Sequence, residues 1–190
     1  MYTSEIFENK NLKLIREFIR ETAFATLISR GDGYPSATHI PLELRRNKNK
    51  EEILTGHMSK ANPHWHEFKS NPKVLAIFLS PIHGFVSSSW YEKPDAPTWN
   101  YMSAHVSGKI KLLTQDETET SLSQLIDKYE SKMDHPVSWN SLSDDVKKQA
   151  KNIVGFEISI DRMEAVFKLS QNRSKEDHAR IIERLCLSET

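Results

Sequence analysis

The chain has 190 residues, with 26 basic and 26 acidic side chains, no net formal charge and a pI near 7.1. That length fits one domain with a core of its own, and a single cysteine, Cys186, excludes an intrachain disulfide and a cysteine zinc cluster. Balanced charge also argues against a protein that grips DNA over its whole surface, because such proteins usually have a basic excess.

The first residues of the chain and its apolar runs predict where in the cell the protein is located. Met1 to Glu5 lack the basic and apolar regions of a signal peptide, and the longest strongly apolar run, Val74 to Leu79, is too short to span a bilayer. We therefore expect a cytoplasmic protein with no membrane partner. We also expect a single domain over 1–190, with a C-terminal helical extension at about 175–187.

The first half of the chain predicts a helix followed by hairpin-linked strands. Leu12, Ile15 and Ile19 recur at helical spacing, and Gly31-Asp32-Gly33 is typical of a turn between two strands. Asn62-Pro63 is typical of a helix start. The expected elements are a helix at 11–20, strands at 24–29, 36–44 and 52–58, a short helix from 61 to 71, and a strand at 74–79 that is covered on both faces.

The second half predicts longer elements. Thr114 and Glu117 have the spacing of a capping box at the start of a helix. The expected elements are strands at 85–91 and 98–113, a loop at 92–97, a helix near 143–151, a strand at 154–160 and a terminal helix at 175–185. A further helix is expected to follow Thr114, with an apolar stripe of Leu122, Leu125, Ile126 and Tyr129. Five or six strands with a helical excursion before the last one predict an antiparallel barrel with peripheral helices.

The first segment with chemical character joins a strand to a helix at Ser59 and Lys60. A phosphate group favours a hydroxyl, a cation and free helix amides at one point, and this junction offers all three. The alternative is that Ser59 only caps the helix and that Lys60 points to solvent.

A second segment contains three successive serines, including Ser88 and Ser89, followed by Trp90. Serine adds little to the packing of a strand, so this run suits a strand that lies against a polar ligand, or an exposed edge strand.

Alternation in the third segment, around Asn100, predicts one face that carries Trp99, Tyr101, Ser103 and His105. Such a face can stack a planar heterocycle, and it equally suits a dimer interface.

The fourth segment lies between the last strand and the last helix and contains Lys168, Gln171, Asn172 and Arg173. The guanidinium of Arg173 can bind a phosphate or carboxylate with two parallel hydrogen bonds, although a surface turn is the alternative. His57, His64 and His66 match no standard metal-site spacing, and we expect no metal and assign no catalytic residue.

In their order along the chain, these segments resemble the PaiB family of FMN-binding negative transcriptional regulators. Each matching stretch alone is weak evidence for the family. Together, in the same order, the stretches are specific evidence and extend over nearly the whole chain. The matching stretches are 1–2, 24–27, 37–42, 56–63, 89–91, 97–101 with His105 and Gly108, 154–158 and 168–173.

The resemblance implies an α+β fold, an FMN-binding split β-barrel that is antiparallel and Greek-key-like, with peripheral helices. The family looks like a branch of the flavoproteins that include pyridoxamine-phosphate oxidases, and it implies a homodimer with FMN between the subunits. By analogy, Ser59 and Lys60 contact the phosphate, while 100–105 and 168–173 reach the flavin from the partner subunit. Family members commonly carry Arg in place of Lys60 and Leu in place of Met58, which implies weaker FMN binding here. Ser88 is a further departure from the family pattern, in which we expect an isoleucine or a similar residue at this position.

The implied function is negative regulation of transcription, and two alternatives stay open. One is an FMN-dependent oxidoreductase, and the other is a haem-binding relative in which His39, His57 and His105 are candidate ligands. No helix-turn-helix is legible in the sequence, so direct DNA binding has no motif in its favour.

Overall fold

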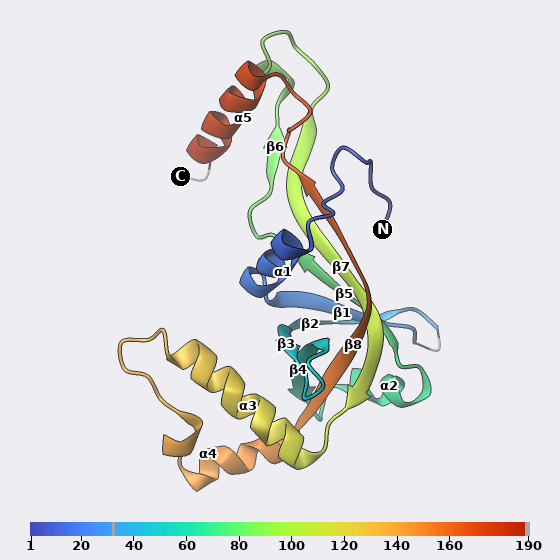
Figure 1. Ribbon diagram of the computed structural model, residues 1–190, viewed down its shortest axis with the longest axis vertical. Coiled ribbons are helices and arrows are strands. Elements are labelled where there is room, and N and C mark those ends of the chain that lie inside the picture. Colours follow the sequence, from blue (N-terminus) through green and yellow to red (C-terminus); the bar gives the residue numbers. More distant parts are fainter. Residues whose placement is uncertain (32, 189–190) are drawn as a thin grey trace. The chain divides into compact units, whose positions relative to one another are not determined.

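The computed structural model describes residues 1–31 and 33–188 (Figure 1). The helices are α1 (Leu12–Glu21), α2 (Glu67–Ser70), α3 (Gln115–Glu130), α4 (Asp144–Lys148) and α5 (Lys175–Ser188). The strands are β1 (Phe24–Ser29), β2 (Ser36–Pro41), β3 (Glu43–Arg46), β4 (Glu52–Ser59), β5 (Lys73–Leu79), β6 (Gly84–Val86), β7 (Thr98–Leu112) and β8 (Ile153–Lys168). Four 3-10 helices complete the elements: η1 (Pro63–His66), η2 (Ser88–Trp90), η3 (Trp139–Ser141) and η4 (Gln149–Asn152).

The strands follow the order β2-β1-β5-β7-β8-β4-β3, with β6 paired to β7. The pairs β1/β2, β3/β4, β4/β8 and β6/β7 are antiparallel, as predicted, but five or six strands was too low a number. The strand predicted at 36–44 is two strands: Phe24 pairs with Pro41, whereas Glu43 pairs with Thr55. Pro41 has no N–H to continue a ladder, so the chain changes partner there.

The chain forms two compact units. The first contains 1–22, 77–105 and the described part of 163–190, and the second contains 23–76 and 106–162. The predicted turn residue Asp32 lies outside the described residues, while the predicted helices and the long strand at 98–113 are confirmed.

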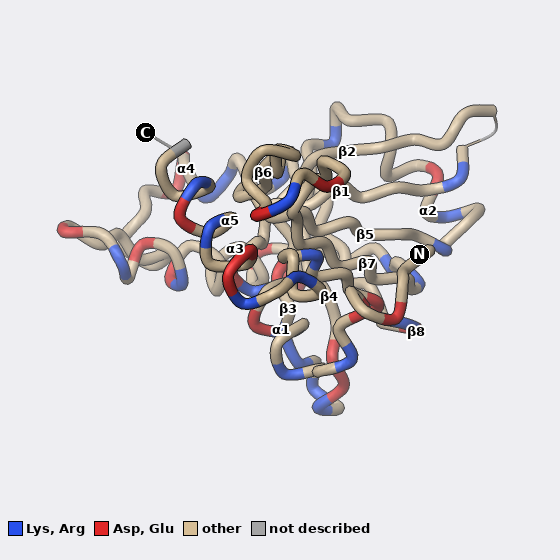
Figure 2. The backbone as a smooth tube through the Cα atoms, turned by 90° about the horizontal axis from the view of Figure 1, so that it is seen from above, with Lys and Arg blue, Asp and Glu red and all other residues tan. Residues whose placement is uncertain are grey.

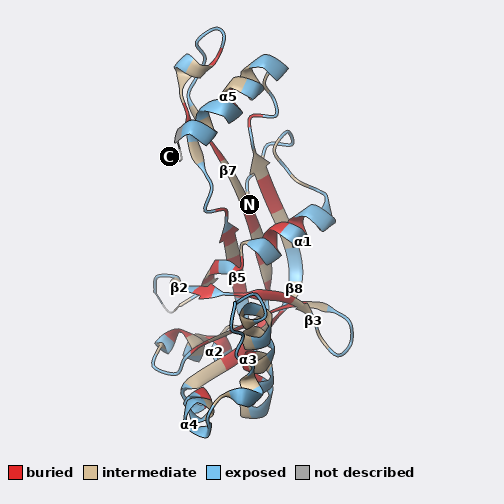
Figure 3. Cartoon of the chain, turned by 90° about the vertical axis from the view of Figure 1, so that its left-hand side faces the viewer, coloured by how far each residue is buried: buried red, intermediate tan, exposed pale blue. Residues whose placement is uncertain are grey.

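The second unit is built around apolar strand faces. Leu42, Leu54, Phe156 and Ile158 are fully buried, and Figure 3 shows buried stretches along the strands, whereas α4 is mostly exposed. A Cβ atom at Gly56 would lie 2.8 Å from the ring of Phe156, so glycine is needed for this close packing.

Helix α3 is fixed at both ends. Thr114 and Glu117 form the predicted capping box. Near the other end, the buried carboxylate of Glu43 accepts hydrogen bonds from Lys128 Nζ (2.5 Å) and the hydroxyl of Tyr129 (2.8 Å). Burial and the bond to Glu43 raise the pKa of Tyr129 to about 12.

In the first unit, α1 begins after Asn11, whose side chain accepts hydrogen bonds from two backbone amides, and it buries Ile15, Phe18 and Ile19. Helix α5 buries Ile181 against Val86 and Tyr91.

Three further strand predictions were wrong in detail. The strand predicted at 154–160 continues to Lys168 as β8. The strand predicted at 85–91 ends at Val86, because the Ser87 side chain accepts a hydrogen bond from the Ser89 amide (3.3 Å) and starts the 3-10 helix η2. In β5, buried residues alternate with half-buried ones and Leu79 is 52% exposed, so the two-sided cover expected for this strand is incomplete in the chain.

Candidate functional site

The turn after β4 presents Ser59 and Lys60 to solvent. The Lys60 amide donates to the Asn152 carbonyl (2.8 Å), and the Asn62 amide donates to the Ser59 carbonyl (3.0 Å), so the turn is held by its backbone. Both side chains are exposed, and the Lys60 ammonium has no ion pair within the described part of the chain. The turn therefore offers a hydroxyl and a free cation side by side.

Ser59 does not cap the helix, so that alternative for the turn is excluded. The side chain of Asn62, not of Ser59, accepts the hydrogen bond from the His64 amide (3.0 Å) at the start of η1. Ser59 Oγ accepts a bond from the Ala61 amide instead (3.2 Å). This local bond fixes the Ser59 hydroxyl within the turn, ahead of the helix.

A polar pocket of about 300 Å³ adjoins this turn through Asn62. Its lining residues are Ser36, Ala37, Thr38, Asn62, Pro63, His64 and Glu67. The amide of Asn62 donates to Thr38 Oγ1 (3.2 Å), which also contacts His64 Nδ1 (2.8 Å). The pocket wall is thus a preorganised set of hydroxyl, amide and imidazole groups.

The imidazole of His64 is at the centre of a buried network. It is 4% exposed, and its Nε2 lies 2.9 Å from the hydroxyl oxygen of Ser29. Ser29 in turn donates to Glu67, which also accepts from Ser36 at 2.5 Å. Because the Ser29 proton goes to Glu67, Nε2 carries the proton of a neutral His64 and Nδ1 accepts from Thr38.

Electrostatics agree with a neutral imidazole. Burial lowers the pKa of His64, against the opposing effect of Glu67. Burial alone would raise the pKa of Glu67, but the hydrogen bonds from Ser29 and Ser36 and the nearby His64 lower it.

In the first unit, an aromatic groove of about 750 Å³ brings together four predicted residues, Trp90, Trp99, Asn100 and Tyr101. Its other lining residues are Ile82, His83, Gly84, Phe85, Met102, Leu169, His178, Ile182 and Leu185. Trp99 is 53% exposed, and its ring lies 5.9 Å from that of Phe85 and 6.0 Å from that of His83. Asn100 is buried, and its Oδ1 accepts from the Ser170 hydroxyl (3.0 Å), which fixes the orientation of the amide.

The other members of the predicted face do not line this groove. Ser103 and Ala104 are both buried, so the alternation of faces breaks before His105. His105 is half-buried; burial and the positive N-terminal amine lower its pKa, against the effect of Glu164. Ser88 and Ser89 are also outside the groove, and the Ser89 hydroxyl bonds to that of Ser87 (3.0 Å).

The predicted segment at 168–173 makes its contacts with other residues of the same chain. Lys168 Nζ donates to Thr98 Oγ1, and the Gln171 side chain donates to the Phe167 carbonyl (2.6 Å). Asn172 is exposed. Arg173 forms an ion pair with Asp95, and its guanidinium carbon lies 4.6 Å from the centre of the Tyr91 ring.

These contacts leave Arg173 poorly placed for a flavin phosphate. A ligand would have to displace Asp95 before both of its parallel hydrogen bonds became available.

The polar pocket and its network were missed by the sequence analysis. Ser29, Ser36, Thr38, His64 and Glu67 belong to β1, β2 and the η1/α2 segment, so no local pattern predicts that they meet. The only signal was the resemblance, since Thr38 and Asn62 lie within two of its matching stretches.

The candidate haem ligands His39, His57 and His105 belong to three different strands, β2, β4 and β7. His39 Nδ1 lies 3.0 Å from Thr26 Oγ1, and its ring stacks on Phe24. His57 is half-buried on β4, and burial lowers its pKa. Within residues 1–31 and 33–188, no group of three His, Cys, Asp or Glu side chains is placed to hold a metal ion.

The helices were also compared with what DNA binding and membrane insertion require. Figure 2 shows basic and acidic residues interspersed along α5, where Glu176, Asp177 and Glu183 accompany Arg180 and Arg184. Among the described helices, none combines the length and apolar character needed to cross a membrane.

Comparison with known proteins identifies the family of the chain. Residues 1–162 match a family model described as "Putative FMN-binding domain". The "Protease synthase and sporulation protein PAI 2" of Bacillus subtilis is 39% identical over 186 residues, which cover 97% of this chain and 89% of that protein.

Two solved structures share the fold. A FAD and heme binding protein from Mycobacterium smegmatis has a TM-score of 0.66 at 18% identity, over 90% of this chain and 78% of that one. The flavocytochrome Anf3 from Azotobacter vinelandii has a TM-score of 0.69 at 14% identity, over 94% and 78%. These likenesses confirm the predicted α+β split β-barrel.

Proposed function

The chain belongs to this family of FMN-binding domains, and from that premise we propose that it is a homodimeric, FMN-dependent negative regulator of transcription. FMN, the predicted cofactor, is confirmed by the family. The observation that carries the regulatory proposal is the relation to the PAI 2 protein over 97% of the chain. That relative is named for effects on protease synthesis and sporulation, which are outcomes of gene expression.

The phosphate of FMN fits the turn after β4. Ser59 supplies a hydroxyl and Lys60 an unpaired cation, and the adjoining polar pocket supplies the Thr38 and Asn62 groups for ribityl hydroxyls. Charge-assisted contacts of this kind are the strongest hydrogen bonds that a phosphate forms with a protein.

The flavin ring fits the aromatic groove. A volume of about 750 Å³ is within the usual range for small-molecule sites, and Trp90, Trp99 and Tyr101 offer ring faces for stacking. Asn100 offers an amide, held by Ser170, for the polar edge of the ring. When bound, FMN supplies redox chemistry, while these residues bind and orient it.

A homodimer places both sets of contacts on one ligand. In our proposal Ser59 and Lys60 of one subunit hold the phosphate, and Trp99 of the partner subunit stacks on the ring. Ile82, Phe85 and Trp99 are 65%, 48% and 53% exposed in the chain, which is typical of a surface that a partner or ligand covers.

The same proposal treats 1–190 as one functional domain in the cytoplasm. Cys186 is free and exposed, as is usual in a reducing compartment. Cell fractionation with an antibody to the chain tests that location.

Spectra and a gel shift test the function. The purified protein should show flavin bands without a Soret band, and promoter DNA should shift at about 50 mM salt, where phosphate contacts are strong. Rapid reduction of the flavin by NADPH together with no DNA shift would instead favour the alternative function, an FMN-dependent oxidoreductase.

A further inference from the structure

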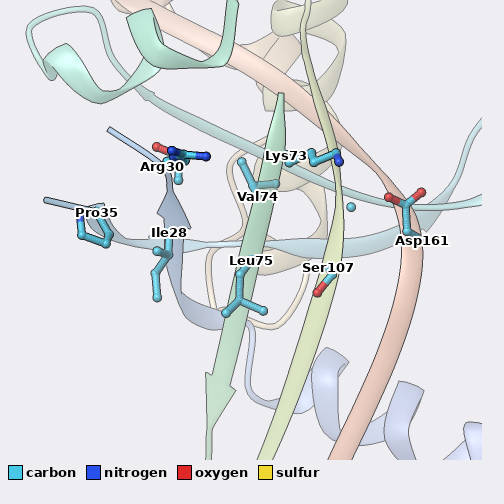
Figure 4. Close-up of a pocket in the computed structure, with 10 residues that line it drawn as sticks. Ile28, Arg30, Pro35, Lys73, Val74, Leu75, Ser107 and Asp161 are labelled. Atoms are coloured by element: carbon cyan, nitrogen blue, oxygen red, sulfur yellow. The ribbon is translucent and has the colours of Figure 1, made fainter. Parts of the chain in front are cut away.

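A separate groove of about 390 Å³ lies in the second unit, at the ends of β1 and β5 (Figure 4). Its lining residues are Ile28, Ser29, Arg30, Pro35, Lys73, Val74, Leu75, Ser107, Gly108 and Asp161. It contains none of the residues to which we assign FMN contacts. We call it the charged groove.

Two cations lie along one side of the charged groove. Arg30 directly follows β1, and Lys73 begins the neighbouring strand β5. Both are exposed, and neither has an ion pair with any residue of 1–31 or 33–188. Two unpaired cations at one groove create a positive potential that favours an anion.

The rest of the lining has other chemistry. Figure 4 shows Val74 and Leu75 along β5 and the Asp161 carboxylate on β8, beyond Ser107. Val74 is buried, but the half-buried Leu75 gives an apolar surface for hydrocarbon, and Asp161 gives an acceptor for a donor group. The charged groove therefore combines a site for an acid group, an apolar surface and a site for a hydroxyl or ammonium group.

One lining residue, Ser29, connects the charged groove to the polar pocket beside the turn at Ser59 and Lys60. Ser29 is 3% exposed, and its hydroxyl bonds to His64 Nε2 (2.9 Å) and to Glu67. Through its other nitrogen, His64 contacts Thr38, which accepts from Asn62 beside the phosphate turn. A continuous set of hydrogen bonds thus extends from the charged groove to the polar pocket.

We infer that the charged groove binds a small organic anion, with its acid group between Arg30 and Lys73 and a donor group toward Asp161. Hydrocarbon between these groups covers Leu75. Binding there changes FMN affinity through Ser29 and His64; this coupling, unlike the site itself, rests on the proposed function. By linkage, FMN changes the affinity for the anion by the same factor.

Calorimetric titration of the FMN-loaded protein with three probes tests the site: inorganic phosphate, hexanoate and ε-aminohexanoate. The last should bind tightest, because it alone carries both an acid group for the cations and an ammonium group for Asp161. Arg30→Gln and Lys73→Gln should each weaken ε-aminohexanoate about tenfold, the usual loss for one charge-assisted contact. Asp161→Asn should remove its advantage over hexanoate and strengthen the binding of phosphate. The matched control is Lys109→Gln, an exposed lysine on β7 outside the groove, which should change nothing.

Undetectable binding of all three probes, or equal losses in Lys109→Gln and Arg30→Gln, would overturn the site. The coupling is measured as the FMN dissociation constant with and without saturating ε-aminohexanoate. A change of about threefold or more that Arg30→Gln abolishes would support it, and an unchanged constant would refute it. FMN binding without probe binding contradicts only this inference, whereas probe binding without FMN binding contradicts the proposed function and the coupling.

Discussion

Replacement of Lys60 by alanine separates phosphate recognition from folding. The Lys60 side chain is exposed and unpaired within the described residues, and its backbone amide keeps the bond to Asn152 in any non-proline variant. The substitution should therefore change the free energy of unfolding by no more than about 0.5 kcal/mol. The same exposure weakens the contact with phosphate, because solvent screens the charge.

We place the expected loss for FMN near the lower end of the range for charge-assisted bonds, at about 1.5 kcal/mol or roughly tenfold in affinity. Riboflavin has the same ring and ribityl chain but no phosphate, so its affinity should stay within about twofold. Lys60→Arg should bind FMN more tightly than the parent, because guanidinium can form two parallel bonds to phosphate.

Flavin fluorescence titrations at neutral pH measure both affinities on one sample. Lys109→Ala, an exposed lysine on β7, is the matched control. Equal weakening of FMN and riboflavin would show that Lys60 acts through the structure of the turn, and no weakening of either would remove Lys60 from the phosphate site.

Further predictions concern assembly, stability and the flavin. Size-exclusion chromatography with light scattering should give about twice the chain mass of 22.0 kDa, and a monomer at micromolar concentration would exclude the shared site. Lys128→Ala removes the cation from the buried Glu43 carboxylate, which keeps its hydrogen bond from Tyr129, and should lower the urea-derived free energy of unfolding by about 2 kcal/mol. A loss of less than about 0.5 kcal/mol would contradict the role of that pair. Because burial lowers the pKa of His64, the unfolded chain binds the additional proton, so stability should fall as pH drops below 6.5 and level off below the folded pKa. His64→Gln should reduce this loss of stability at low pH, as measured by thermal unfolding. An unchanged dependence of stability on pH would contradict the role of His64. If NADPH reduces the flavin, His105→Ala should shift the pH profile of reduction, and an unshifted profile would exclude that residue.

Sequence patterns predicted those helices and strands that are determined by residues close together in the chain. The capping box of α3 needs only Thr114 and Glu117, three positions apart, and it was found. The strand predicted over the serine run was wrong because a single hydrogen bond from Ser89 to Ser87 stabilises a 3-10 turn there. Apolar spacing does not report such bonds.

The site was harder to predict because its contacts join distant positions. Arg173 has the chemistry of a phosphate ligand, but Asp95, 78 residues earlier in the chain, takes its guanidinium. Ser29 and His64 are 35 residues apart, and neither has a neighbour that signals the network. Resemblance compares whole segments and not local spacing, and it pointed to the turn at Ser59 and Lys60, whose role in binding FMN stays a prediction.

The match to the family model ends at residue 162, while one wall of the aromatic groove consists of Leu169, His178, Ile182 and Leu185. The turn proposed to hold the phosphate and this wall of the groove are therefore encoded in separate stretches of the gene. Mutations in the last stretch can reshape the groove while leaving the turn after β4 intact. Under the proposed function, contacts with the flavin ring can thus diversify within the family while contacts with its phosphate stay unchanged.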